Sequence, residues 1–250
     1  MESLVSIITP SFNSEKFISE TIISVQNQTY TNWEMMIVDD CSSDKTVQII
    51  QSFIDEDPRI HLIQLNKNAG AAKARNFGIE KITGKYMTFL DADDIWFSDF
   101  IESSIKTIKQ TGINFVFSSY KRSNENLEFV YSDFIVPKKV TYTDILKTNS
   151  ISCLTAFINV ETLGIKKMPD ILKRQDMGLW LKYLKEIPFS YGIQEPKAIY
   201  RIRQNSLSRN KRNLLKYQWQ FYYKVEKLGL FPSIYYMLHW MIRGFLKYRN

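Results

Sequence analysis

Short apolar runs alternate with segments of helical spacing along the first ninety residues. The apolar runs, each of a length typical of a buried strand, cover residues 5–9, 33–38, 60–65 and 86–90. Between them, the segments in which apolar residues recur at helical intervals cover 17–28, 44–54 and 71–81. Strands that alternate with helices in this way predict an α/β fold, a mostly parallel sheet with helices on both faces.

The pattern is less regular up to residue 213 and becomes helical after it. Further strands are expected at 115–120 and 151–159 and near 199–202, with a polar loop over 124–139 and a helix over 177–184. A chain of 250 residues suits one large α/β domain and is short for two. We therefore expect a Rossmann-like domain over residues 1–210 and a helical tail over residues 211–250.

Two acidic clusters follow predicted strands. Asp39 and Asp40 come after the second strand, and Asp91-Ala92-Asp93-Asp94 comes after the fourth. Ligands of open α/β sheets bind beyond the carboxyl ends of the strands, so both clusters are candidate binding residues. Asp91 and Asp93 can direct oxygens at one hard divalent cation, Mn²⁺ or Mg²⁺, and Asp40 can bond to a ribose or a base edge. The alternative is that the acids only cap the next helices.

Two further segments combine charge with a defined spacing. Arg75 lies in the segment 68–76, near the start of a helix, where a cation suits an anion or a base carbonyl. Arg201 and Arg203 lie one residue apart in a strand, so they share a face and can grip a diphosphate. Solvated basic faces of an ordinary helix and strand are the alternatives.

Asp176 is a single acid among apolar residues, with Trp180 one helical turn further along. A carboxylate beside an apolar wall can serve as a general base, because burial favours its protonated form. The alternative is a surface acid that caps a helix.

The joint order of these segments is more specific than any one of them. SIITPSFN, VDDCSSD, NAGAAKARN, DADD, QD three residues before LW, and YRIRQNSLS follow one another over residues 6–208. In this set the chain resembles the family 2 glycosyltransferases, which have the GT-A fold. It is similar to the small bacterial enzymes of that family that build O-antigen, capsule and teichuronic acid polymers.

The resemblance implies a role for each matching residue. The nucleotide base would be lined by Pro10 and Phe12 and contacted by Arg75, and Asp40 would contact the uracil or ribose. Asp91 would contact the ribose or the metal, and Asp93 would be the principal metal ligand. Asp176 would deprotonate the acceptor hydroxyl, and Trp180 would wall the acceptor sugar. The family often has His where this chain has Arg203, so the phosphate and metal contacts there stay open.

The implied activity is transfer of a sugar, with inversion, from a UDP-sugar to a saccharide carried on a lipid diphosphate. One alternative is a catalytically silent binder of sugar nucleotides, although Asp91, Asp93 and Asp176 are all intact. Another is a processive polymer synthase, which is disfavoured because no stretch has the roughly 18 continuous apolar residues of a spanning helix.

Charge and aromatic residues concentrate in the tail. Residues 211–250 hold eight Lys or Arg, one acid (Glu226) and eleven of the 35 aromatic residues, whereas the net charge of the chain is +7. Within the helix expected over 231–248, Ile234, Leu238, Met241 and Phe245 have helical spacing. Such a helix suits the headgroup region of an anionic membrane. The alternative is a lid that packs on the domain or on a second subunit of a homodimer.

Several other classes are disfavoured. Cys41 and Cys153 lie far apart and predict neither a disulfide nor a zinc site, which suits a reducing compartment. The N-terminal residues lack the basic region and cleavage site of a signal peptide. We therefore expect a cytoplasmic protein on the inner face of a bacterial cell membrane. No nucleic-acid-binding pattern accompanies the basic tail.

Overall fold

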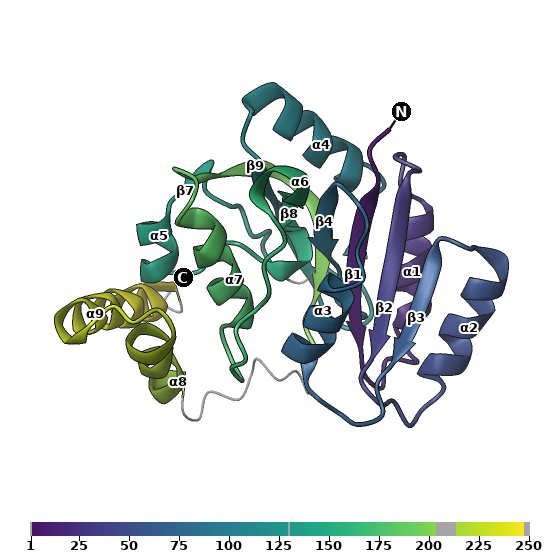
Figure 1. The fold of residues 1–250 in the computed structure, drawn as a ribbon, viewed down its shortest axis with the longest axis horizontal. Helices are drawn as coiled ribbons and strands as arrows, with labels where there is room; N and C mark the ends of the chain where they lie inside the picture. The colour runs from purple at the N-terminus through teal and green to yellow at the C-terminus, as the bar shows by residue number, and fades with distance from the viewer. Residues whose placement is uncertain (1, 130, 204–213, 248–250) are drawn as a thin grey trace.

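The computed structural model of the chain describes residues 2–129, 131–203 and 214–247. Within these residues a nine-stranded sheet runs in the order β3-β2-β1-β4-β8-β6-β9-β5, with β7 paired to β9. Helices cover the sheet, and the last two helices lie beside it (Figure 1). The predicted α/β fold class is confirmed.

The four N-terminal strands pair in parallel. They are β1 (Val5–Ser11), β2 (Trp33–Asp39), β3 (Ile60–Gln64) and β4 (Tyr86–Phe89). The helices between them are α1 (Ile18–Gln26), α2 (Thr46–Glu56) and α3 (Ala71–Ile79). All four strands therefore end at one edge of the sheet, the lower edge in Figure 1.

The second half of the sheet is mixed. Its strands are β5 (Ile95–Trp96), β6 (Phe115–Ser123), β7 (Lys139–Val140), β8 (Phe157–Asn159) and β9 (Ser190–Arg201). β8 is antiparallel to both β4 and β6, and β6 is parallel to β9. β6 and β9 thus run in the direction of β4 and end at the same edge as β1 to β4.

The strand expected over 151–159 is only partly correct. Cys153–Thr155 forms a 3₁₀ turn, and the strand begins at Phe157. Two side chains hold this turn. Trp96 Nε1 donates to the carbonyl of Leu154 at 2.8 Å, and Thr155 Oγ1 donates to the carbonyl of Ser118 at 2.9 Å. These tertiary bonds take the place of strand pairing.

Two hydrophobic clusters fill the core, one on each face of the sheet. Because successive side chains of a strand point to opposite faces, Ile7 belongs to one cluster and Ile8 to the other. The Ile7 cluster includes α1 and α4 (Phe100–Thr111). The Ile8 cluster includes α5 (Tyr142–Lys147), α6 (Val160–Leu163) and α7 (Gln175–Leu184).

The helical tail is confirmed, and its first part packs into the domain. It consists of α8 (Leu214–Gln220), a π-helical turn (Phe221–Val225) and α9 (Leu230–Lys247). Phe221 and Tyr222 are buried in the Ile8 cluster, and the Tyr222 hydroxyl donates to the carbonyl of Leu146 at 2.5 Å. The expected boundary at residue 210 lies outside the described residues. Among the described helices, none has the length and hydropathy needed to cross a bilayer.

We predict that Gly178→Ala destabilises the protein, because α7 approaches its neighbours closely at this glycine. An added Cβ would lie 2.5 Å from Cγ of Pro169 and 3.4 Å from Cε2 of Phe221. Such overpacking costs about 1–3 kcal/mol, more than the roughly 1 kcal/mol that alanine adds in helix propensity. Urea denaturation measures the change. Lys106→Ala, at an exposed position of α4, is the control and should stay within about 0.5 kcal/mol of wild type. A more stable Gly178→Ala protein would contradict the close approach.

Candidate active site

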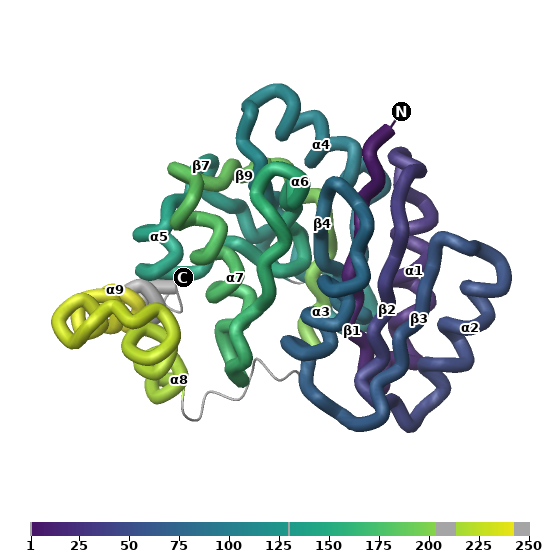
Figure 2. The backbone as a smooth tube through the Cα atoms, viewed as in Figure 1, coloured from purple at the N-terminus to yellow at the C-terminus, as the bar shows by residue number. Residues whose placement is uncertain are grey.

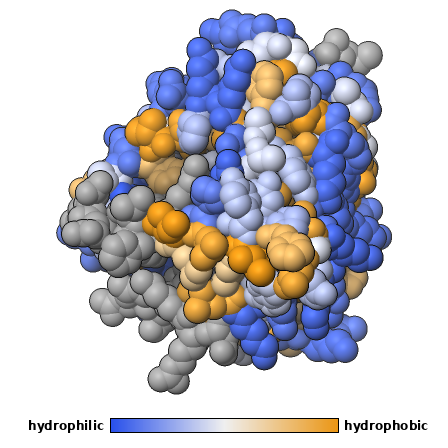
Figure 3. All heavy atoms as spheres, turned by 90° about the vertical axis from the view of Figure 1, so that its left-hand side faces the viewer, coloured by the Kyte–Doolittle hydropathy of each residue, from blue (hydrophilic) through white to orange (hydrophobic). Residues whose placement is uncertain are grey.

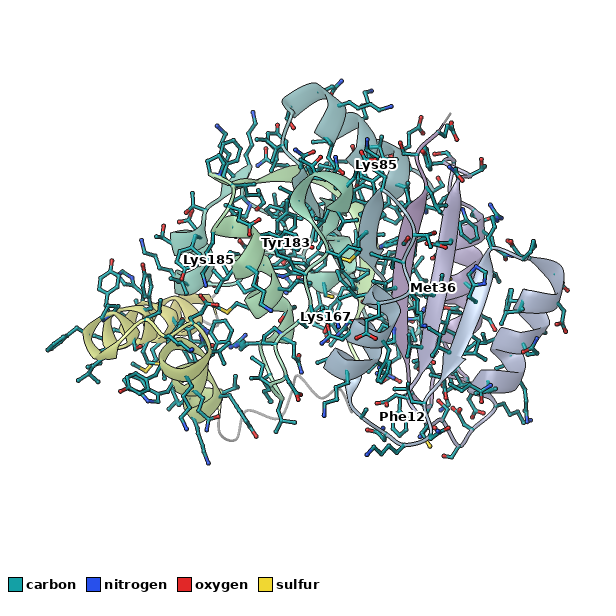
Figure 4. The ribbon with its side chains drawn as sticks, in the orientation of Figure 1. Phe12, Met36, Lys85, Lys167, Tyr183 and Lys185 are labelled. Carbon is teal, nitrogen blue, oxygen red and sulfur yellow. The ribbon has the colours of Figure 1, made fainter. Side chains whose placement is uncertain are left out.

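The carboxyl edge of the sheet carries an exposed aromatic ring and several acids. Phe12 follows β1 and is 48% exposed, while Pro10 within β1 is partly exposed. In Figure 4 Phe12 lies at this edge and Lys85 lies at the opposite, amino-terminal edge. The side chain of Phe12 is therefore free to stack on a flat ligand.

Asp39 and Asp40 connect the ends of β1 and β2 to the start of α3. Asp39 Oδ1 accepts from Oγ of Ser11 at 3.0 Å and from Oγ of Ser42 at 2.5 Å. The Asp40 carboxylate, only 3% exposed, accepts from the backbone N–H groups of residues 69–70 at 2.6 and 2.8 Å. Asp39 thus holds the local turn at Ser42 as well as the end of β1, whereas Asp40 is bound to a distant segment at the start of α3.

Arg75 and Asp91 form an ion pair in which Arg75 is nearly buried and Asp91 is partly exposed. Arg75 extends from α3 to the carboxylate of Asp91, just beyond β4. Burial acts to lower the pKa of Arg75, but the charge of Asp91 and its hydrogen bond, with the charge of Asp176, raise that pKa overall. Nε of Arg75 has no hydrogen-bond partner among the residues that the structure describes. The pair brings the third helix and the fourth strand to one point of the site.

Asp93 and Asp94 meet the end of β9. Arg203 Nε lies 2.6 Å from Asp93 Oδ2. Burial, and then the charge of Asp91, raise the pKa of Asp93. Asp94 is fully buried, and its Oδ1 accepts from the backbone N–H of Arg201 at 2.9 Å. Burial raises the pKa of Asp94 well above its ordinary value, and its Oδ2 has no partner within the described part of the chain.

Asp176 joins this cluster from a distant segment. It lies in the first turn of α7, where the helix dipole favours negative charge. Asn149 Nδ2 donates to its Oδ2 at 3.0 Å. The charges of Asp91 and Asp176 both act on Arg75 and on Cys153. Burial raises the pKa of the Cys153 thiol, so Cys153 is a neutral neighbour of the site.

A hollow opens beside this cluster. Its volume is about 230 Å³, and its lining includes Phe17, Arg203, Asn13 and Glu125. A larger hollow of about 370 Å³ lies beside Tyr86 and near the N-terminus, at the other edge of the sheet. Of the predicted site residues, Arg203 lines the smaller hollow, which therefore borders the cluster on the side of the residues beyond β9.

Comparisons with known proteins identify the family to which this arrangement belongs. The profile of Glycosyl transferase family 2 matches residues 6–160. TuaG of Bacillus subtilis, named as a teichuronic acid biosynthesis glycosyltransferase, is 40% identical over 90% of this chain and 89% of its own length. The chain belongs to glycosyltransferase family 2.

The likeness extends over nearly all of the given chain of this family 2 glycosyltransferase. WfgD of Escherichia coli, a UDP-Glc:α-D-GlcNAc-diphosphoundecaprenol β-1,3-glucosyltransferase, is 38% identical over 98% of this chain and 95% of its own length. The crystal structure of S. aureus TarS residues 1–349 in complex with UDP-GlcNAc superposes with a TM-score of 0.74. At 20% identity it covers 96% of this chain and 72% of that one, which confirms the predicted GT-A fold.

The role expected for Trp180 is wrong. This side chain is fully buried, with ring centroids 6.0 Å from Phe89 and 5.4 Å from Phe115. It lies on the apolar face of α7 that packs against the sheet, so it cannot line an acceptor sugar. Asp176 and Trp180 lie on one face of α7, but Asp176 is in its first turn and partly exposed, whereas Trp180 is one turn further along and enters the core.

The joint grip expected of Arg201 and Arg203 is also corrected. The two guanidinium carbons lie over the same ring, 4.7 and 5.5 Å from the centroid of Phe17, so the shared face is confirmed. Arg201, however, is buried and paired with Glu20 of α1, because a buried guanidinium needs a carboxylate partner. Only Arg203, with its side chain 34% exposed, can turn to a ligand. Ser206 and Ser208 of the same segment lie outside the described residues.

Three residues at the site were not predicted from the sequence to belong to it. Asn149, Cys153 and Phe17 belong to no acidic or basic pattern, and each reaches the site from a separate element. The only sequence signal for these residues is their place between the motifs. Such a place gives their order along the chain but does not say which residues they contact.

We predict that Trp180→Phe leaves the KM for acceptor within about twofold of wild type, because the ring never reaches the surface. The free energy of unfolding should fall by about 1–3 kcal/mol through lost packing. Steady-state kinetics measures the first effect, and urea denaturation monitored by fluorescence measures the second. A tenfold rise in the acceptor KM at unchanged stability would restore the acceptor-wall role.

Proposed function

We propose that this enzyme transfers a hexose from a UDP-sugar to a saccharide carried on a lipid diphosphate, with inversion at the anomeric carbon. The observation that carries the proposal is the position of Asp176. A carboxylate from the far half of the chain stands beside the Arg75–Asp91 pair at the carboxyl edge of the sheet. The activity in the name of WfgD and the ligand of the TarS crystal structure support this donor and acceptor.

The donor lies across the carboxyl ends of β1, β2 and β4. Phe12 is exposed enough to stack on the uracil, beside Pro10. Asp40 has lone pairs left after its two backbone bonds, and these face the base or ribose. Arg75 lies at the base side, and Asp91, held by Arg75, contacts the ribose. The sugar diphosphate then points toward Asp93 and Asp176.

Asp176 is the general base. Its carboxylate takes the proton of the acceptor hydroxyl while that oxygen forms a bond to the anomeric carbon. The bond between the anomeric carbon and the diphosphate oxygen breaks, and UDP leaves with the electron pair. Because the displacement is direct, one base suffices, as in inverting hydrolysis. Asn149 holds one oxygen of Asp176 and thereby orients the other.

Asp93, with Asp91, suits a divalent cation, Mn²⁺ or Mg²⁺. No group of three potential metal-ligating side chains occurs within the described residues. Two carboxylates fit a Mg²⁺-like ion, which keeps waters and substrate phosphates in its shell. Such an ion supplies neutralisation of the charge that develops on the leaving diphosphate. Asp93 has Arg203 as its partner, so this guanidinium and the ion compete for one carboxylate.

A catalytically silent sugar-nucleotide binder is the second candidate. It would share the donor contacts but would have no use for an oriented carboxylate at Asp176. The hydrogen bond from Asn149 therefore favours the enzyme.

We predict that the wild-type protein forms product from a UDP-hexose and a short-chain diphosphate-lipid saccharide, and that Asp176→Asn lowers kcat by roughly two to four orders of magnitude. The amide is nearly isosteric but takes no proton. Donor affinity should change little. Product analysis by mass spectrometry and calorimetric titration with UDP measure the two quantities.

Asp55→Asn is the matched control, since Asp55 lies exposed on α2. It should keep wild-type kcat. If Asp176→Asn lost donor affinity and kept kcat, Asp176 would be a binding residue. If no UDP-hexose gave product with the wild-type protein, this donor class would be wrong.

We predict opposite effects of two substitutions on metal binding. Asp93→Ala removes a ligand and should abolish Mn²⁺ binding together with transfer. Arg203→Gln removes the competing cation, so Mn²⁺ affinity should rise by up to about fivefold, the scale of a partly exposed ion pair. The KM of the donor or the acceptor should rise in Arg203→Gln if that guanidinium turns to a diphosphate. Titration of free Mn²⁺ by electron paramagnetic resonance measures affinity without turnover. Full transfer by the wild-type enzyme in chelator would exclude the metal.

A further inference from the structure

Helix α9 carries apolar side chains on two opposite faces. Its inner face packs on the protein, since Tyr236 and Met237 contact the Ile8 cluster and Ser233 is fully buried. Its outer face is a continuous stripe of side chains at helical spacing that are between 38 and 82% exposed: Phe231, Ile234, Tyr235, Leu238, Met241 and Ile242. Figure 3 shows hydrophobic side chains gathered on this side of the molecule. We call these six residues the outer stripe.

The outer stripe is more apolar than the solvent-exposed face of an ordinary surface helix. Surface helices of soluble proteins have one apolar face and one polar face, and large contiguous apolar patches mark interaction sites. Leu230 and Tyr223, both about half exposed, extend the apolar surface toward α8. Leu172, 78% exposed, adds a further apolar side chain just before α7.

The positive charge of the tail indicates which kind of partner covers the outer stripe. Lys216, Lys224 and Lys227 are exposed on the same tail. Glu226, the single acid of residues 211–250, is paired with the catalytic domain instead of with the tail. Its side chain is 4% exposed, lies 2.7 Å from Lys185 Nζ and accepts a hydrogen bond from the Tyr142 hydroxyl. The positive charge of the tail is therefore unbalanced. A second copy of the chain would bring an equal positive charge against it, whereas an anionic surface would neutralise it.

We propose that the outer stripe of α9 docks the enzyme onto the surface of an anionic lipid bilayer. The helix lies in the headgroup plane, because its inner face is held by the protein and no described helix can cross a bilayer. The outer-stripe side chains enter the upper acyl region, and the lysines of the tail meet the anionic headgroups. This location is the inner face of the cell membrane, with the catalytic domain in the cytoplasm.

Docking in this orientation places the start of the catalytic helix directly behind α9, on the face of α9 that points away from the bilayer. The guanidinium of Arg174, the N-cap residue of α7, lies 5.4 Å from the ring centroid of Trp240 of α9. Asp176 follows two residues later, and Leu172 precedes. Under the proposed function, which this step requires, the lipid diphosphate of the acceptor stays in the bilayer while its saccharide reaches Asp176.

We predict that the wild-type protein floats with vesicles of phosphatidylcholine and phosphatidylglycerol, less with phosphatidylcholine alone, and less at high salt. The double variant Leu238→Glu, Ile242→Glu should partition at least about tenfold less, since each buried aliphatic side chain contributes roughly that factor or more. Ile23→Glu is the matched control. Ile23 is similarly exposed but lies on α1, on the far side of the molecule from α9 in Figure 2, so this variant should float like wild type.

Circular dichroism and thermal unfolding of the double variant check that it is folded, and both substituted side chains are exposed. Absence of wild-type flotation with anionic vesicles, or equal flotation of the folded double variant, would overturn the docking. So would sedimentation equilibrium that showed a wild-type dimer, dissociated by the double variant, together with no flotation.

Activity separates this proposal from the proposed function. With a water-soluble short-chain acceptor, the double variant should keep the wild-type kcat, and with a vesicle-embedded acceptor its rate should fall. A protein that floats as predicted but transfers no sugar would uphold the docking and contradict the proposed function.

Discussion

The concentration of negative charge beyond β4 is the constraint on which this structure depends. Three of the four residues from 91 to 94 are acids, Asp91, Asp93 and Asp94, and burial raises the pKa of the last two. A buried carboxylate without a partner costs several kcal/mol, so cations must come to this edge. Arg75 arrives from α3 and Arg203 from beyond β9. The sheet order places both elements where β4 ends, and the site is the consequence.

Arg203 makes this balance unlike that of a site with His. A guanidinium keeps its charge at every accessible pH, so Asp93 is neutralised before any ligand arrives. The ring of Phe17 supports both Arg203 and Arg201, and the guanidinium of Arg201 is paired with Glu20 while that of Arg203 is paired with Asp93. One arginine therefore serves the fold and its neighbour serves the site, although the two are one residue apart. This division links α1 to the carboxyl edge of the sheet.

The tail and α7 form one packed unit. Gly178 of α7 lets Pro169 and Phe221 approach closely, and Trp240 lies beside Arg174 at the start of the same helix. The part of the tail that packs and the part that stays exposed are thus both connected to the position of Asp176. Both interpretations of the tail have support in different residues: α8 and the π-helical turn are a packing element, and the outer stripe is the surface that the membrane proposal needs.

The sequence alone determined the fold class, the strands and helices of the first ninety residues, and the family, because these depend on local periodicity and on the order of motifs along the chain. It also indicated that Asp91 and Asp176 would share a site, through the resemblance. Only the tertiary structure decided that Trp180 belongs to the core and that Arg201 is paired with Glu20. Periodicity assigns a residue to a face of its own element. Packing of the elements decides which neighbour covers that face. It also decides which distant carboxylate pairs with a buried guanidinium.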